Sequence, residues 1–199
     1  MGRLAHLLLP HRCPVCLRPG ESPCATCRGA LAPPPAAPAP AGVDGCIAAV
    51  AYRGEGRAVV AAVKFRGDRG PLPWLAGVLV DDLASSSPAS PALVTWVPAT
   101  APHRRSRGVD GTELLARAVA AELGRPVHRV LRRGAGPPQV GRDAVARRSG
   151  PVLDCRSPVS GPVLVVDDVV TTGGTATAAA RALRAAGADA VWFAAIART

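Results

Sequence analysis

VLVVDDVVTTGGT, the stretch from Val163 to Thr175, decides the predicted fold. Its first four residues form a continuous apolar run, which is typical of a strand buried on both faces of a parallel sheet. Two adjacent acids follow, then a short polar loop with two glycines, and then an alanine-rich segment that predicts a helix over residues 175–186. This order places the polar loop at the carboxyl end of a strand, where open α/β sheets bind their ligands.

The rest of the chain alternates between strand and helix patterns around this stretch. Short apolar runs predict further strands over residues 46–52, 93–97, 127–131 and 190–196. Apolar residues at helical spacing predict helices over residues 57–65, 75–83 and 112–123. Thr112 is available as the N-cap of the last of these helices. The alternation predicts an α/β domain with an open, mostly parallel sheet and helices on both faces.

The loop after the two acids has the composition of a phosphate-binding site. Gly173 and Gly174 allow backbone N–H groups to turn inward, and the N-terminus of the next helix favours a dianion. Three hydroxyl side chains add donors: Thr171, Thr172 and Thr175. Asp167 and Asp168 are placed to accept from vicinal hydroxyls or to hold Mg²⁺ through water. A phosphate beside a diol describes a ribose 5-phosphate, and the alternative interpretation is a buried strand with an acid-rich turn.

Four of the six cysteines form two C-x2-C pairs, Cys13 with Cys16 and Cys24 with Cys27. Paired knuckles place four thiolates at the corners of a tetrahedron, and four protein ligands leave no open position for catalysis. A disulfide or a redox-active pair is the alternative, but neither a secretion signal nor a thioredoxin-like βαβ pattern accompanies the cysteines. We therefore predict a structural Zn²⁺ site with these four ligands.

Composition divides the 199 residues into three parts. The cysteine pairs predict a zinc-binding module over residues 1–30, five prolines predict a stiff linker over residues 31–43, and residues 44–199 hold the predicted α/β domain. Hydrophobic residues make up 48% of the chain, which excludes general disorder. No apolar run reaches the roughly 20 residues of a membrane helix, and no cleavable signal is evident, so we expect a cytoplasmic protein without membrane insertion.

The formal net charge of +10 favours polyanionic partners such as nucleic acid, phosphate esters or pyrophosphate. Of the 24 basic residues 23 are arginines, however, and this coding bias weakens the inference from total charge. The distribution says more, because twelve basic residues lie within residues 104–156 against five acids. The only lysine is Lys64.

Val163 to Thr175 resembles the phosphoribosyl-pyrophosphate (PRPP) binding motif of type I phosphoribosyltransferases. The chain as a whole resembles the ComF branch, whose members join an N-terminal four-cysteine zinc module to a phosphoribosyltransferase-like domain. Three further segments carry this resemblance: VKFRGD at residues 63–68, VPATAPHRRSRG at residues 97–108 and PPQVGRDAVAR at residues 137–147. The resemblance implies a type I phosphoribosyltransferase sheet preceded by a zinc-knuckle module.

The resemblance also implies which residues bind PRPP, with Mg²⁺ accompanying the ligand. The predicted PRPP-binding residues are Asp167, Asp168, Val169, Val170, Thr171, Thr172, Gly173, Gly174 and Thr175. The predicted pyrophosphate-side residues are Arg104, Arg105, Arg107 and Lys64, whose cations would neutralise the leaving group. Residues 132–142 match a loop that closes over the site.

The sequence leaves the catalytic residues and the acceptor undetermined. The ComF branch reads RGFNQ where this chain has Arg107-Gly108-Val109-Asp110-Gly111, and Thr171 stands where purine-salvage relatives place an acid/base carboxylate. One hypothesis is an enzyme that transfers the phosphoribosyl group from PRPP to an unknown nucleophile. The alternative, also implied by the resemblance, is a non-catalytic accessory protein of competence and DNA uptake that binds single-stranded DNA or partner proteins. With only six aromatic residues, base-stacking platforms are scarce.

Overall fold

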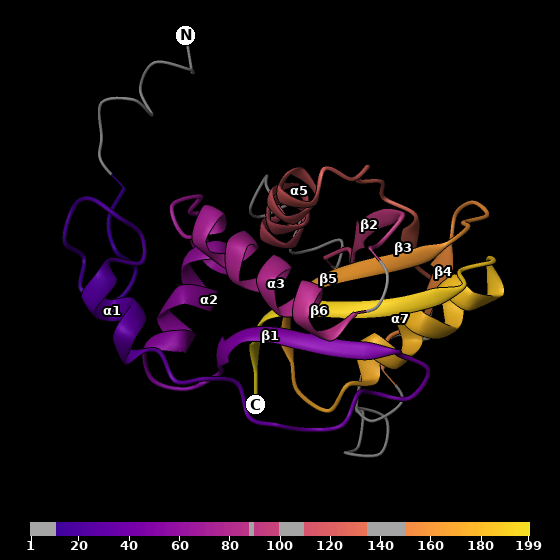
Figure 1. Cartoon of the computed structure of the whole chain (residues 1–199), viewed down its shortest axis with the longest axis horizontal. Helices are drawn as coiled ribbons and strands as arrows, with labels where there is room; N and C mark the ends of the chain where they lie inside the picture. Colours follow the sequence, from indigo (N-terminus) through magenta and orange to yellow (C-terminus); the bar gives the residue numbers. More distant parts are fainter. Residues whose placement is uncertain (1–10, 88–89, 100–109, 135–149) are drawn as a thin grey trace, which may run out of the picture.

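The computed structural model describes residues 11–87, 90–99, 110–134 and 150–199 (Figure 1). Its helices are α1 (Ala25–Ala30), α2 (Glu55–Arg66), α3 (Leu72–Ser86), α5 (Gly111–Leu123) and α7 (Gly174–Ala185). Its strands are β1 (Gly45–Ala51), β2 (Leu93–Trp96), β3 (Leu131–Arg133), β4 (Leu153–Cys155), β5 (Pro162–Val170) and β6 (Ala190–Arg198).

Four strands form one sheet in the order β1-β6-β5-β2, and every neighbouring pair is parallel. The two central strands, β5 and β6, are in register with Val165 opposite Phe193. Every residue of β6 after Ala190 is buried, as expected for a central parallel strand covered on both faces. The predicted α/β fold with an open parallel sheet is therefore confirmed.

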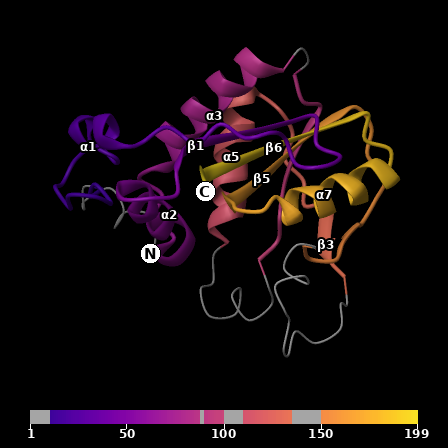
Figure 2. The same cartoon turned by 90° about the horizontal axis from the view of Figure 1, so that it is seen from below.

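The alternation of side chains along β5 builds two separate cores. Leu164 and Val166 join a cluster with α2, α3 and α5, whereas Val163 and Val165 join a cluster with α7. Helices α3 and α7 accordingly lie on opposite sides of the sheet (Figure 2). Full burial of each such side chain contributes about 1.5–3 kcal/mol, so both faces of β5 are fixed by packing.

One predicted strand and one predicted cap are wrong. Residues 127–131 do not form a strand: Val127 makes a single parallel bridge to Val94, and β3 begins only at Leu131. Pro126 precedes the bridge and has no N–H for a longer ladder. β3 instead pairs antiparallel with β4 in a separate two-stranded sheet that packs on α7.

The N-cap of α5 is Asp110 rather than Thr112. The Asp110 Oδ1 atom accepts a hydrogen bond of 3.1 Å from the Thr112 N–H, and Thr112 itself is buried within the first helical turn. Oδ2 of the same carboxylate accepts from the Ala99 N–H at 3.1 Å. Asp110 therefore joins the chain just after β2 to the start of α5.

The segment from Leu31 to Asp44 has no helix or strand and lies against the ends of β1 and β6. The Ala51 N–H donates to the Ala32 carbonyl at 2.9 Å. The buried Arg198 guanidinium donates to the carbonyls of Ala37 at 3.2 Å and Pro38 at 2.8 Å. Within the described residues, no helix has both the length and the apolar character needed to cross a bilayer.

Candidate functional site

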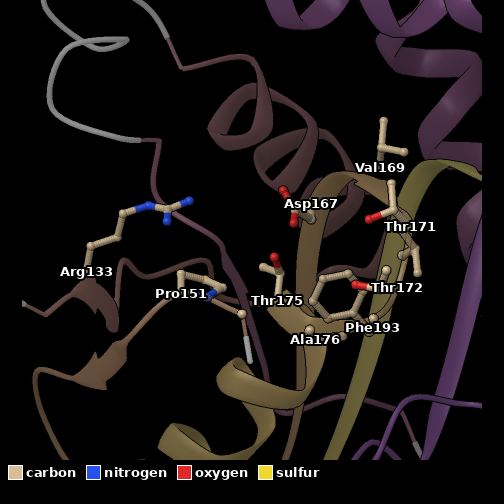
Figure 3. Close-up of a pocket in the computed structure, with 13 residues that line it drawn as sticks. Arg133, Pro151, Asp167, Val169, Thr171, Thr172, Thr175, Ala176 and Phe193 are labelled. Carbon is tan, nitrogen blue, oxygen red and sulfur yellow. The ribbon is translucent and has the colours of Figure 1, made fainter. Parts of the chain in front are cut away.

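A cavity of about 570 Å³ lies at the carboxyl end of β5 (Figure 3). It is lined by Asp167, Val169, Val170, Thr171, Thr172, Gly173, Gly174, Thr175, Ala176, Phe193, Arg133, Gly150 and Pro151. Eight of the nine residues predicted to bind PRPP are in this lining, and the exception is Asp168. In the described part of the chain, the lining combines a polar loop, the Asp167 carboxyl group, the Arg133 guanidinium group and the buried ring of Phe193.

The two acids lie within β5, which continues past them to Val170. Because successive side chains of a strand point to opposite faces, Asp167 and Asp168 diverge. Asp167 follows Val163 and Val165 on the α7 side and lines the cavity. Asp168 follows Leu164 and Val166 on the other side, where it forms an ion pair with Lys64 of α2. The structure therefore brings Lys64 to the acid pair through Asp168.

Asp167 holds its proton more tightly than an ordinary aspartic acid. Burial and the neighbouring Asp168 carboxylate raise the pKa of Asp167 to about 8. Three groups counteract this rise: the Asp168 N–H, which donates to Asp167 Oδ1 at 2.8 Å, and the cations of Lys64 and Arg133. In the ligand-free protein this carboxyl group therefore favours its protonated form more than an ordinary aspartic acid does.

The loop from Thr171 to Gly173 leads into the N-terminus of α7 without a side-chain cap. Gly173 adopts φ 77°, a left-handed conformation, and a Cβ there would lie 2.8 Å from the Pro40 ring. Glycine is required at this position by both the backbone and the contact. The first N–H groups of a helix have no intrahelical acceptor, so this end of α7 presents donors and a positive dipole to the cavity.

Among the residues that the structure describes, Arg133 is the basic residue in the cavity lining, and the sequence did not single it out. Its Nε donates to the Pro98 carbonyl at 2.8 Å, which ties the guanidinium to the end of β2. Figure 3 shows the guanidinium directed toward the space that Asp167 and Thr175 also face. The neighbouring Arg132 points to the opposite face of β3, with Nε 3.7 Å from Asp154. Only the strand register distinguishes the two arginines.

Of the four predicted pyrophosphate-side residues, Lys64 pairs with Asp168 and is not part of the cavity lining. Arg104, Arg105 and Arg107 lie outside the described residues, as does the segment 137–147.

The four cysteines of the two C-x2-C pairs come together as a potential metal site. Their Sγ atoms all lie within 4.8 Å of one another, and those of Cys16 and Cys24 are 3.8 Å apart. Tetrahedral Zn–S bonds of about 2.3 Å imply S···S distances of about 3.8 Å. The residues present therefore fit a metal ion bound by four thiolates.

The thiols of this group differ in acidity. Despite burial, backbone hydrogen bonds from Cys16, Cys24 and Val15 lower the pKa of Cys13 to about 6. Burial and the neighbouring cysteines raise the pKa of Cys27 to about 12. Four thiols in one small volume cannot all ionise without a cation between them, which is the situation that a bound divalent metal ion stabilises.

Comparison with known proteins gives no family assignment. No family model matches the chain, and no curated protein matches it. A crystal structure of an adenine phosphoribosyltransferase is similar over 64% of this chain and 75% of that one, at 19% sequence identity and a TM-score of 0.40. The fold described above rests on the strand order and pairing of this chain.

Proposed function

We propose that the cavity binds a ribose 5-phosphate group, carried by PRPP together with Mg²⁺, and that the chain transfers the phosphoribosyl group to an acceptor. The observation that carries the proposal is the meeting of three features in one cavity: an uncapped helix N-terminus, threonine hydroxyls and the Asp167 carboxyl group. The first two suit a phosphate dianion, and the third suits vicinal hydroxyls beside it. The sequence resemblance to the PRPP motif supports the same ligand.

In this proposal each part of the cavity meets one part of the ligand. The 5-phosphate accepts hydrogen bonds from the loop at Thr171–Thr175, and the ribose hydroxyls donate to Asp167. Arg133 faces the diphosphate, where Arg104, Arg105 and Arg107 would add further positive charge. Lys64 acts indirectly, because it neutralises Asp168 and lowers the proton affinity of Asp167. With Asp168 unpaired, two carboxylates on neighbouring residues of β5 would repel a polyanion.

The proposed transfer needs charge stabilisation more than a strong base. The bond between ribose C1 and the diphosphate oxygen breaks, and diphosphate leaves with the electron pair. A lone pair of the acceptor forms the new bond to C1, and the proton of the acceptor passes to solvent. Positive charge develops on the ribose ring and negative charge on the leaving group. In this proposal Asp167, in its ionised form, stabilises the ribose end of the transition state and Arg133 stabilises the diphosphate end.

Two metal ions complete the proposal. Hard oxygen donors such as the Asp167 carboxylate and the threonine hydroxyls suit Mg²⁺, which when bound would neutralise diphosphate oxygens. The four cysteines suit a structural Zn²⁺. In this arrangement residues 1–30 are the zinc module, residues 31–43 the linker and residues 44–199 the ligand-binding domain.

Isothermal titration of the purified protein with PRPP and with ribose 5-phosphate, each with MgCl₂, tests the proposal. We expect both to bind, and Asp167→Asn to weaken both, whereas Asp154→Asn, which removes a carboxylate outside the cavity, leaves binding unchanged. Absence of binding to either compound at millimolar concentration contradicts the proposal. Diphosphate release during a screen of candidate acceptors then tests transfer. If only single-stranded DNA binds, with strong salt dependence, the nucleic-acid alternative is favoured.

A further inference from the structure

The four-cysteine module packs against the segment that joins α2 to α3. Ser22 of the module is buried, and a Cβ on Gly70 of this connector would lie 2.8 Å from the Ser22 side chain. The guanidinium carbon of Arg28 lies 6.0 Å from the centre of the Trp74 ring, in the first turn of α3. His11 Nδ1 lies 4.0 Å from Asp68 Oδ1.

This connector begins at the helical turn that holds Lys64. Helix α2 ends at Arg66, and the next residue, Gly67, caps it in a left-handed conformation. The Asp68 N–H then donates back to the Ala62 carbonyl at 3.0 Å, and the Gly70 N–H donates to Asp68 Oδ1 at 2.8 Å. The last turn of α2 and the connector are therefore one hydrogen-bonded unit, with the module on one side and Asp168 on the other.

The linker gives the module a second route to the cavity. It leaves α1 at Leu31, which packs against the core cluster of α2 and α3. Its carbonyls at Ala37 and Pro38 are bonded to Arg198, and Pro40 then lies against Gly173 of the cavity loop. The N-terminal part of the chain thus contacts the connector after α2, which carries Lys64 toward Asp168, and also the loop at Gly173.

We propose that the metal-bound four-cysteine module is a positioning element for the cavity. By holding the connector it keeps Lys64 on Asp168, and through the linker it keeps Pro40 against the loop at Gly173. Loss of the metal ion, or of the contact with the connector, releases the last turn of α2. Asp168 then loses its counter-charge and the cavity becomes less favourable for an anion. The ligand part of this inference rests on the function proposed above.

Gly70→Ala tests the contact without touching a cysteine, Lys64 or the cavity. The added Cβ would lie 2.8 Å from the Ser22 side chain and 3.2 Å from Asp68 Oδ1, so we expect it to push the module away from the connector. Gly29→Ala in α1 and Gly77→Ala in α3 are matched controls, because a Cβ at either position meets nothing within 4 Å. Each variant is loaded with zinc, its metal content is measured, and its affinity for ribose 5-phosphate is determined by titration.

We expect Gly70→Ala to retain zinc and to bind ribose 5-phosphate about tenfold more weakly, as for the loss of one charge-assisted contact. Lys64→Gln should weaken binding by a similar factor, Lys64→Arg should largely restore it, and the Gly70→Ala/Lys64→Gln double variant should be no weaker than either single one. Wild-type affinity in Gly70→Ala, or fully additive losses in the double variant, would overturn the inference.

Hydrogen exchange of the ligand-free protein separates this inference from the proposed function. Removing zinc by chelation should raise amide exchange at residues 64–70 and 171–175, and Gly70→Ala should do the same while zinc remains bound. If the wild type binds no ribose phosphate but these segments respond, the proposed function fails and the positioning role stands. If ribose 5-phosphate binds but amide exchange at both segments is the same with and without zinc, the positioning role is contradicted and the proposed function is not.

Discussion

Asp167 and Asp168 are neighbours in sequence but belong to different environments. The pleat of β5 sends Asp168 to Lys64 and Asp167 into the cavity with Arg133. One carboxylate is compensated by an ion pair, and the other is left with a raised pKa. A pair of acids that differ in this way can offer one ionisable group to a ligand while keeping the total negative charge of the site low.

The raised pKa of Asp167 predicts a pH-dependent stability. An aspartic acid in the unfolded chain has a pKa of about 3.9, below the value of about 8 in the folded protein. The folded state thus binds this proton more tightly, and the stability linked to it is complete below pH of about 4 and is lost as the pH rises through 8. Asp167→Asn has no titrating group at this position, so its stability should not fall in this pH range for that reason.

Melting curves of the ligand-free protein between pH 5 and 9 check this prediction. The melting temperature of Asp167→Asn should exceed that of the wild type by an amount that grows with pH, at roughly 2–4 °C for each kcal/mol relieved. Asp154→Asn, at a partly exposed position outside the cavity, should follow the wild type. Parallel curves for wild type and Asp167→Asn would show that Asp167 titrates near its ordinary value.

Substitution of Arg133 and of Arg132 tests which of the two arginines contributes to anion binding in the cavity. Only Arg133 lines it, whereas Arg132 lies near Asp154 on the opposite face of β3. Arg133→Gln should weaken binding of inorganic pyrophosphate by about tenfold or more, since hydrogen bonds to charged groups contribute about 1.5–3 kcal/mol. Arg132→Gln should have little effect. Equal losses in the two variants would indicate a diffuse electrostatic effect instead of a specific contact.

At the level of single residues, sequence reasoning found the loop and missed the cation. Two glycines between threonines are conspicuous, and eight residues of that stretch line the cavity. Arg133 is one of twelve basic residues in the middle of the chain, and its role depends on the register of a three-residue strand. Composition cannot reveal such a register.

Strand β5 is longer than its sequence pattern predicts, because pairing with β6 extends it. The apolar run predicted the core of β5, but the strand continues through both acids because β6 pairs with it as far as Val170. Propensity would end a strand at adjacent aspartates, since this residue is depleted in strands. Pairing with a buried central strand outweighs that preference and determines which acid faces the cavity.

The start of α5 depends on two adjacent residues, Asp110 and Gly111. Asp110 supplies the N-cap. A Cβ at Gly111 would lie 2.4 Å from the Val63 carbonyl oxygen. In this chain α5 thus packs too closely on α2 for any larger residue, immediately beside Lys64.

The double role of Asp110 predicts a measurable loss of stability on its removal. Asp110→Ala loses the cap of α5 and the contact with Ala99, and it should lower the free energy of unfolding by about 1–2 kcal/mol. Asp110→Asn should retain most of the stability, because an amide oxygen still accepts one of the two N–H groups. Denaturation in urea measures both variants, and an unchanged midpoint for Asp110→Ala would contradict the capping role.

For the whole molecule, the sequence predicted the class of fold but not how its N-terminal part is integrated. Five prolines in residues 31–42 indicated a separating linker. In the structure this segment lies against Arg198 and Gly173. Val15 and Leu31 pack against the main core cluster. These contacts join residues far apart in the chain, and no local pattern in the sequence encodes them.

Because the N-terminal part packs against the main core, we predict that metal removal destabilises the whole fold and not the module alone. A structural metal ion contributes directly to folding free energy, and here the module shares a core cluster with α2 and α3. Chelation, or Cys13→Ser at one of the two buried cysteines of the group, should lower the melting temperature of the main unfolding transition by several degrees. Cys155→Ser, at a cysteine outside the four-cysteine group, should change it little.

The shape of the transition distinguishes a shared core from an independent module. If the module is attached through the linker alone, chelation should unfold only the module and leave the midpoint of the main transition unchanged. If Val15, Leu31 and the Ser22–Gly70 contact join the two parts, chelation should shift the main transition itself. Calorimetry with and without zinc checks this, and an unmoved main transition would contradict the integrated core. The packing of these residues against the cluster of α2 and α3 favours the shift.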